Sequence, residues 1–430
     1  MVVVTNDETE LQAMSDHDNT NGKDEDHERN SPVVDSKNPL RRSVFRAMVQ
    51  DFGPLWFTWC MNAGIISTLL HQFPYQFQGV QVLSTIGFLL DLTLYVIFSV
   101  IFTLRFLLYR GQALAEITSN VPELCLMPTW CIAFMTLVSF VSLTVSNATW
   151  GGENWTLLAV AMWWMATVWM FGKLFFCFIT LIREHNLLDR QLPTLIIIPA
   201  VGVATLAAVG GVVTTSAHDL SANLAVPIIL TSFCAAGVGL ILGLILYTYL
   251  FHQLLAHGWP AAASTPTIFI LVGPMGQTAA ALQLLGAAAN THGRFAAYNH
   301  GTFLTASAAG PLEIACQLLA LLMTGLGAVF FILSLCALAD RAWHRELAWS
   351  PAWNAIIFPT GTLVTSTLLF ADVMDSPFFR VVTAMLTLFL VMVFFINVVF
   401  TVWKAYKGQL LVVREDPRVK ARLAELRKES

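Results

Sequence analysis

The feature that most constrains this chain is a series of ten long apolar runs that begins just after residue 50. A run of roughly 20 apolar residues is long enough for a helix to cross a bilayer. Barrel strands would alternate polar and apolar residues, whereas these runs are apolar throughout, so helices are expected. Charged residues make up 12% of the chain, about half the usual share in soluble domains. We therefore predict an all-α integral membrane protein with ten transmembrane helices, at 54–72, 80–104, 124–145, 155–182, 192–215, 223–250, 265–289, 311–339, 351–370 and 379–403.

The segments outside these runs are polar and charged. Residues 1–40 contain ten acidic and three basic side chains and no aromatic ones, a composition typical of disorder. We expect a disordered acidic cytoplasmic tail at 1–44, one ten-helix domain at 45–405, and a charged cytoplasmic tail at 406–430. The seven cysteines form no CxxC pair, so neither a zinc site nor a disulfide framework is indicated, and no metal or cofactor is expected. Residues 41–430 contain 20 basic and 17 acidic side chains, so no nucleic-acid partner is expected.

Basic residues indicate the orientation in the membrane. With ten spans both termini lie on one side, and the positive-inside rule makes that side the cytoplasm. Only Arg294 and Arg380 fall on the opposite side. The cytoplasmic side receives Arg41, Arg42, Arg46, Arg105, Arg110, Arg183, Arg190, Arg341, Arg345 and eight bases between Lys404 and Lys428. Two glycosylation sequons, at Asn147 and Asn154, fall in a loop that this topology places outside.

Prolines interrupt the odd-numbered spans at a common depth. Pro128, Pro199, Pro274 and Pro359 each follow the start of an odd span by roughly 4–10 residues, and Pro54 opens the first span. The five prolines are separated by 74, 71, 75 and 85 residues. A proline removes one helical hydrogen bond and frees carbonyls one turn back. The pattern predicts five helical hairpins, each with a kinked first helix and a straighter second helix.

The common depth of the kinks favours a shared hydrated pathway. In lipid, freed backbone groups cost several kcal/mol unless protein or water satisfies them. We therefore expect an inner ring of kinked odd helices around a pore and an outer ring of even helices; the alternative is that each proline is an independent packing kink. The polar side chains near the kinks are neutral and suit an anion that must be partly dehydrated, although each could instead bond to a neighbouring helix. They are Asn62, Thr129, Thr205, Gln277, Thr278, Thr360 and Thr362.

Two charged residues lie deep within apolar runs. Asp91 is in the second span and Lys173 is in the fourth. Charges inside a membrane mark functional sites by default and are usually paired. Both residues belong to the outer set of helices, so we favour a structural role for them, as an ion pair or with Lys173 reaching toward the cytoplasmic surface.

Four short motifs point to a known family. They are Phe73-Pro74-Tyr75, Ile197-Ile198-Pro199, Gly273-Pro274-Met275-Gly276-Gln277 and Phe358-Pro359-Thr360-Gly361-Thr362. From about residue 45 to about 405 the chain resembles the tellurite-resistance/dicarboxylate transporter family, which includes plant slow anion channels, fungal malate permeases and fungal sulfite exporters. The resemblance implies a homotrimer with one pore per subunit and a phenylalanine that plugs the pore, which is Phe358 here. The pore candidates are Asn62, Gly64, Pro128, Thr129, Pro199, Gly273, Pro274, Gly276, Gln277, Pro359, Thr360, Gly361 and Thr362.

The resemblance implies efflux of sulfite across a fungal plasma membrane. A malate-type dicarboxylate permease and a general anion channel are the alternatives on the same fold. A dicarboxylate would be expected to need a cationic clamp such as an arginine, and no odd span contains one. An intramembrane enzyme would need a cluster of His, Asp or Cys at one depth, but the histidines lie at span ends or in loops. A receptor or sensor read out through the tails is the remaining alternative.

Overall fold

The structure, a computed structural model, describes residues 48–184, 192–217 and 220–407. Within these ranges the regular elements are helices, apart from an isolated bridge between His300 and Leu304. The tails expected at 1–44 and 406–430 lie outside them, except for the last helical residue and one turn residue. Nine helices of the described part are long and apolar enough to cross a membrane. The expected first span is a short 3-10 turn, η1 (Pro54–Trp56), followed by the 15-residue α2 (Phe57–His71), so a tenth span stays a prediction.

Five long helices expose most of their apolar surface. Only 11–39% of the most apolar stretch of each is buried, which is the pattern of helices that face lipid, since apolar side chains outside need an apolar solvent. These outer helices are α3 (Val80–Leu108), α7 (Glu153–Glu184), α9 (Ala222–His257), α12 (Ala306–Trp343) and α14 (Pro377–Tyr406). They correspond to the even-numbered spans of the sequence prediction.

The odd-numbered spans form the interior. In the four that meet the length criterion, 78–94% of the most apolar stretch is buried, and most of α2 is buried as well. Each inner segment consists of consecutive short elements. They are η1 with α2; α5 (Val121–Leu126), α6 (Thr129–Phe140) and the π-helical turn η2 (Val141–Val145); η3 (Thr194–Ile197) with α8 (Ile198–Ser216); η4 (Ala262–Leu271) with α10 (Val272–Ala289); and η5 (Pro351–Ile356) with α13 (Ile357–Val373).

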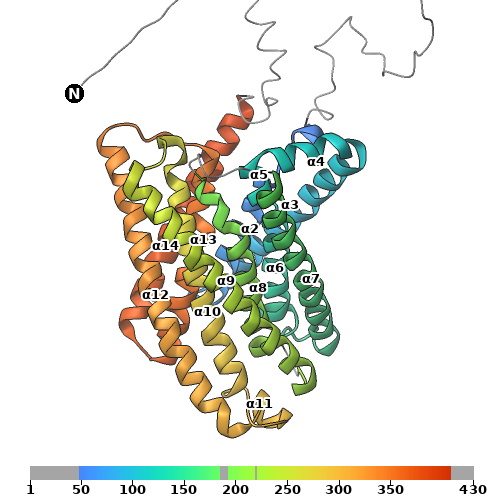
Figure 1. The fold of residues 1–430 in the computed structure, drawn as a ribbon. Coiled ribbons are helices and arrows are strands. Elements are labelled where there is room, and N and C mark those ends of the chain that lie inside the picture. The colour runs from blue at the N-terminus through green and yellow to red at the C-terminus, as the bar shows by residue number, and fades with distance from the viewer. Residues whose placement is uncertain (1–47, 185–191, 218–219, 408–430) are drawn as a thin grey trace, which may run out of the picture. The chain divides into compact units, whose positions relative to one another are not determined.

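The inner helices close into a ring in chain order. Helix α2 contacts α6, α6 contacts α8, α8 contacts α10, α10 contacts α13, and α13 returns to α2. Each inner helix also contacts the outer helix that follows it, as α2 does α3 and α13 does α14. Figure 1 shows these helices running alongside one another. The structure therefore has an inner ring of odd-numbered segments and an outer layer of even-numbered helices, as the proline pattern predicts.

The expected proline kinks take a different form from a bent α-helix. Pro128 is the residue before α6, Pro199 is the second residue of α8, and Pro274 and Pro359 are the third residues of α10 and α13. Proline costs little in the first turn, where its missing N–H has no partner in the helix in any case. The interruption is thus a junction between a short first element and an α-helix. In η1, η3, η4 and η5 that first element is a tighter 3-10 turn.

Basic residues of the outer helices gather at the end where the inner segments begin. Arg105 of α3 donates to the backbone oxygen of Phe52 (3.0 Å), Arg341 of α12 to that of Pro260 (2.9 Å), and Lys404 of α14 to that of Trp349 (3.2 Å). The short α4 (Arg110–Ser119) lies at this end and α11 (Arg294–Tyr298) at the other (Figure 1). The basic residues that the sequence analysis assigned to one side of the membrane therefore include three that lie together at one end of the helix bundle.

Candidate functional site

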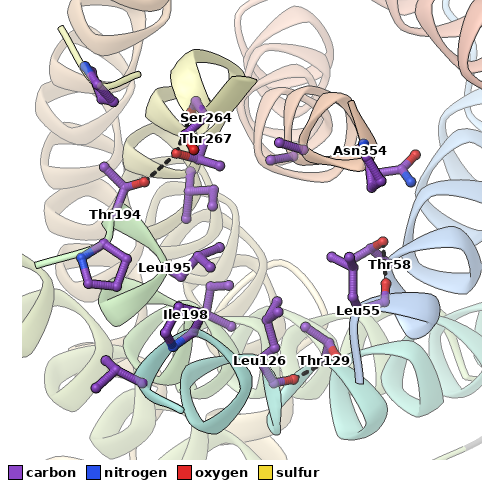
Figure 2. A pocket seen from close by; sticks show the side chains of 18 of the residues that line it. Leu55, Thr58, Leu126, Thr129, Thr194, Leu195, Ile198, Ser264, Thr267 and Asn354 are labelled. Atoms are coloured by element: carbon purple, nitrogen blue, oxygen red, sulfur yellow. Dashed lines mark hydrogen bonds between the residues drawn. The ribbon is translucent and has the colours of Figure 1, made fainter. Parts of the chain in front are cut away.

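A cavity of about 1280 Å³ lies at the end where the five inner segments begin. Every inner segment contributes to its wall: Pro54 from η1, Leu126 from α5, Thr194 from η3, Thr267 from η4 and Asn354 from η5. Figure 2 shows side chains of these segments around one opening. Because the segments of a closed ring all contribute, the cavity lies on the axis of the ring and opens at the end where the basic residues gather.

The cavity ends within about two helical turns of the junctions between the first elements and the α-helices. For the five inner segments in chain order, the last residues that line the cavity are Asn62, Ile132, Val201, Ile270 and Pro359. Phe358 lies at this same level, is 3% exposed and belongs to the wall. Phe358 therefore lies at the inner end of the cavity, immediately before Pro359 in the first turn of α13. We call Phe358 the candidate gate.

Most hydroxyl groups in the wall already donate to backbone carbonyls. Thr58 donates to the oxygen of Leu55 (2.7 Å), and Thr129 lies within hydrogen-bond distance of the oxygens of Leu126 (2.7 Å) and Pro54 (2.9 Å) (Figure 2). These carbonyls belong to the short first elements, whose last oxygens have no helical partner. The hydrogen of the Thr129 hydroxyl is therefore used locally, and a contact of this group with an anion stays a prediction.

Asn62 and Gln277 also have protein partners. Asn62 accepts a hydrogen bond from the backbone N–H of Phe358 at 3.1 Å. The amide of Gln277 donates to the hydroxyl of Thr205 at 3.1 Å, which joins α10 to α8, and Thr205 in turn donates to the oxygen of Val201 at 2.8 Å. An amide carries two N–H groups, so Gln277 keeps one donor besides this bond.

Two of the candidate hydroxyls have no hydrogen-bond partner among the described residues. They are the Oγ1 atoms of Thr360 and Thr278, which are 0% and 1% exposed. Unpaired buried hydroxyls are uncommon, because each costs about 1–3 kcal/mol. Thr360 lies two residues beyond Phe358 on α13 and does not line the cavity.

The glycines of the motifs allow close helix packing and do not line the cavity. A Cβ atom on Gly276 of α10 would lie 2.2 Å from Oγ1 of Thr362 on α13, and one on Gly361 would lie 2.6 Å from a side-chain carbon of Ile65. Thr362 itself donates to the oxygen of Pro359 at 2.7 Å. Of the sequence candidates, only Asn62, Thr129, Phe358 and Pro359 line the cavity; Gly64, Pro128, Pro199, Gly273, Pro274, Gly276, Gln277, Thr360, Gly361 and Thr362 do not.

Asp91 and Lys173 do not pair with each other. Asp91 is fully buried, and the hydroxyl of Thr136 on α6 donates to its Oδ2 at 2.8 Å. Gly64 on α2 makes room for this contact, since a Cβ there would lie 2.5 Å from the same carboxyl oxygen. Lys173 lies 5.8 Å from the centre of the Trp130 ring. Neither residue forms a salt bridge within the described ranges.

The two sequon asparagines lie at the end opposite the cavity mouth. Asn154 is exposed at the start of α7. Asn147 is exposed too, but its amide donates to the backbone oxygens of Ser142 (3.0 Å) and Ser216 (2.6 Å). Glycosylation of either residue stays a prediction.

Sequence reasoning missed two asparagines that the structure connects to Asn62. Asn354 in η5 is 4% exposed and lines the cavity, and Asn397 in α14 is fully buried. A buried amide in an otherwise apolar span needs a hydrogen-bond partner, so both asparagines could have been chosen as candidates from the sequence. Neither lies beside one of the prolines that directed attention to the other candidates.

The charged residues of the cavity wall differ from those expected in a binding site for a dicarboxylate. Within the described ranges, no lysine or arginine lines it, and its ionisable side chains are Glu123 and His257. A bidentate arginine is the usual way to bind a carboxylate firmly. The wall is thus suited to weak contact with a small anion more than to tight binding of a dicarboxylate.

Comparison with known proteins identifies the family of the chain. The family model SLAC1, described as voltage-dependent anion channel, matches residues 51–402. A sulfite efflux pump of Trichophyton rubrum is 23% identical over 84% of this chain and 93% of its own length. A putative malic acid transport protein of Schizosaccharomyces pombe is 23% identical over 86% and 83%, and an uncharacterised transporter of Methanocaldococcus jannaschii is 24% identical over 74% and 83%. The chain therefore belongs to the SLAC1 voltage-dependent anion channel family.

Proposed function

We propose that this protein carries small anions, sulfite foremost, out of the cell through the axis of the inner ring, with Phe358 as the gate. The observation that carries the proposal is the axial cavity, because all five inner segments line it and it ends at Phe358. An apolar ring across a narrow pathway is a barrier, since it cannot replace the hydration shell of an anion. We further propose that the hydroxyl of Thr360, which is buried and unpaired two residues beyond Phe358 on α13, donates to the anion past that barrier.

The position of the basic residues supports outward transport. Arg105, Arg341 and Lys404 lie at the end where the cavity opens, and clusters of this kind mark the cytoplasmic side. We infer that the cavity opens to the cytoplasm, that both termini are cytoplasmic, and that the membrane is the plasma membrane. An anion would then enter the cavity from inside and be driven outward by a negative membrane potential.

We propose sulfite rather than malate as the substrate because of the residues that line the cavity. The relatives include proteins named for each substrate, so relatedness alone does not choose. The described wall offers neutral groups and no arginine clamp, which suits a compact anion. We also propose a homotrimer with one pathway in each subunit, as the family resemblance implies, in which part of the exposed apolar surface of the outer helices lies against neighbouring subunits.

Flux into liposomes tests the substrate assignment. Purified protein is reconstituted at equal folded amounts, and the initial fluxes of sulfite, chloride, nitrate and malate are compared. We expect sulfite to pass faster than malate by about tenfold or more, the equivalent of about 1.4 kcal/mol in the barrier. Malate flux equal to or above sulfite flux would contradict the assignment and favour a dicarboxylate permease. Protein-free liposomes are the control for leakage.

A further inference from the structure

The backbone of the candidate gate is held by a neighbouring helix. Phe358 is the second residue of α13, where a backbone N–H has no partner in an α-helix. That N–H donates to Oδ1 of Asn62 on α2 at 3.1 Å, and Asn62 is fully buried. The position of Phe358 therefore depends on how the side chain of Asn62 is oriented.

Asn62 is itself held by a chain of amides that leads to the outer layer. Its Nδ2 donates to the backbone oxygen of Asn354 (3.1 Å) and to Oδ1 of the same residue (3.3 Å). Nδ2 of Asn397 on α14 donates to that Oδ1 at 3.4 Å, and the indole N–H of Trp349 donates to Oδ1 of Asn397 at 3.1 Å. We call Trp349, Asn397, Asn354 and Asn62 the asparagine chain.

Both ends of the asparagine chain determine the direction of its hydrogen bonds. An indole N–H and a backbone N–H are donors only, so Oδ1 of Asn397 must face Trp349 and Oδ1 of Asn62 must face Phe358. The Nδ2 groups of both asparagines then point at Asn354, whose two oxygens accept from them. These bonds fix one consistent orientation for the amides of Asn62 and Asn397, and in a buried network of this kind the loss of one member disturbs the others.

We propose that Asn397, on the outer helix α14, is a positioning residue for the gate. Through Asn354 and Asn62 it holds the backbone of Phe358, so that the end of α14 nearest Lys404 is coupled to the pathway. Lys404 extends this connection to the surface, since it donates to the backbone oxygen of Trp349 at 3.2 Å and lies 5.0 Å from the centre of the Trp349 ring. The inference rests on the proposed function, in which Phe358 closes the pathway.

The substitution Asn397→Leu removes both hydrogen bonds of Asn397 while keeping similar volume. We expect sulfite flux per folded protein to rise roughly 3- to 10-fold, the range that corresponds to losing one typical hydrogen bond. The ratio of chloride to sulfite flux should rise with it, because a less firmly held ring discriminates less. Thr387→Val is the matched control: Thr387 is 1% exposed on the same helix, but its hydroxyl donates to Thr383 of its own helix at 2.7 Å. This control should leave flux and ion ratio unchanged.

A double substitution separates positioning from a general effect on packing. In the Phe358→Ala background the ring is absent, so Asn397→Leu should change flux by less than about twofold, within ordinary non-additivity. The same multiplicative increase in both backgrounds would overturn the inference, as would a single Asn397→Leu variant that behaves like Thr387→Val. If Phe358→Ala alone fails to raise flux, the gate assignment itself is wrong, which is a separate outcome.

A milder variant keeps the test decisive if Asn397→Leu does not fold. Trp349→Phe removes only the indole donor that orients Asn397 and leaves the three asparagines in place. Its flux and chloride ratio should shift in the same direction as for Asn397→Leu, and the shift should vanish in the Phe358→Ala background. Folded Trp349→Phe protein with wild-type flux and ion ratio would contradict the asparagine chain.

Discussion

Phe358 is the residue on which the proposed mechanism depends most. Removing its ring by Phe358→Ala should raise anion conductance per folded protein and reduce discrimination among anions, because the pathway becomes wider and wetter at that point. If Phe358 served only for packing, the same change would instead cost about 3–5 kcal/mol of stability and lower the flux. Conductance recorded from equal amounts of folded protein decides between these two signs. Conductance at or below that of the unsubstituted protein would rule out the gate.

Thr360 allows stability and transport to be separated. Its hydroxyl is buried and has no partner within the described residues, so Thr360→Val should leave thermal stability unchanged or slightly higher. Sulfite flux should nevertheless fall about 3- to 10-fold, the equivalent of one hydrogen bond to the passing anion. Thr362→Val is the comparison, because that hydroxyl donates to the oxygen of Pro359 and its loss should lower stability. Unchanged flux in stable Thr360→Val protein would show that this hydroxyl does not contact the anion.

At the scale of single residues, the sequence predicted only part of the cavity wall. Of the candidates chosen from the motifs and from the polar residues near the kinks, Phe358, Pro359, Asn62 and Thr129 line the cavity, and their roles stay predictions. The hydroxyl of Thr129 and the amide of Asn62, however, bond to protein. Whether a polar group faces a pathway or a neighbouring helix depends on the rotation of that helix, which a nearly uniform apolar sequence leaves undetermined.

At the scale of elements, the glycine on α10 that faces α13 gives a packing prediction. Gly276→Ala would place a methyl group 2.2 Å from Oγ1 of Thr362 and 2.5 Å from the backbone nitrogen of Leu363. We expect a loss of about 1–3 kcal/mol, typical of overpacking, seen as a lower midpoint of thermal unfolding in detergent. Gly325→Ala on the outer helix α12 is the control, because nothing lies within 4 Å of its Cβ position. Equal midpoints for the two variants would contradict the close approach of α10 and α13.

The inner and outer elements were predictable because their sequences differ in a way that packing requires. Prolines at regular intervals marked the inner segments, which are now found largely buried, and the even runs lacked that pattern and are largely exposed. The junctions between 3-10 and α-helix were not predictable, since proline is compatible with a bent helix and with the first turn of a new one. The 15-residue α2 was also not distinguished from a full span by hydropathy alone.

For the whole molecule, the central claim is that the ring of inner segments forms a passive pathway for an anion. A potential of 100 mV, negative inside, is worth about 2.3 kcal/mol per charge, enough to sustain an outside-to-inside ratio of about 50 for a monovalent anion. Energy from the voltage alone would therefore suffice for efflux.

The most direct measurement is sulfite flux in liposomes under an imposed potassium diffusion potential, with the pH gradient varied independently. The account predicts that the direction and size of the flux follow the voltage and that flux reverses when the voltage is reversed. At zero voltage, a pH gradient should have little effect when the concentration of the transported anion is matched on the two sides. A flux that ignores the voltage and follows the pH gradient would contradict it.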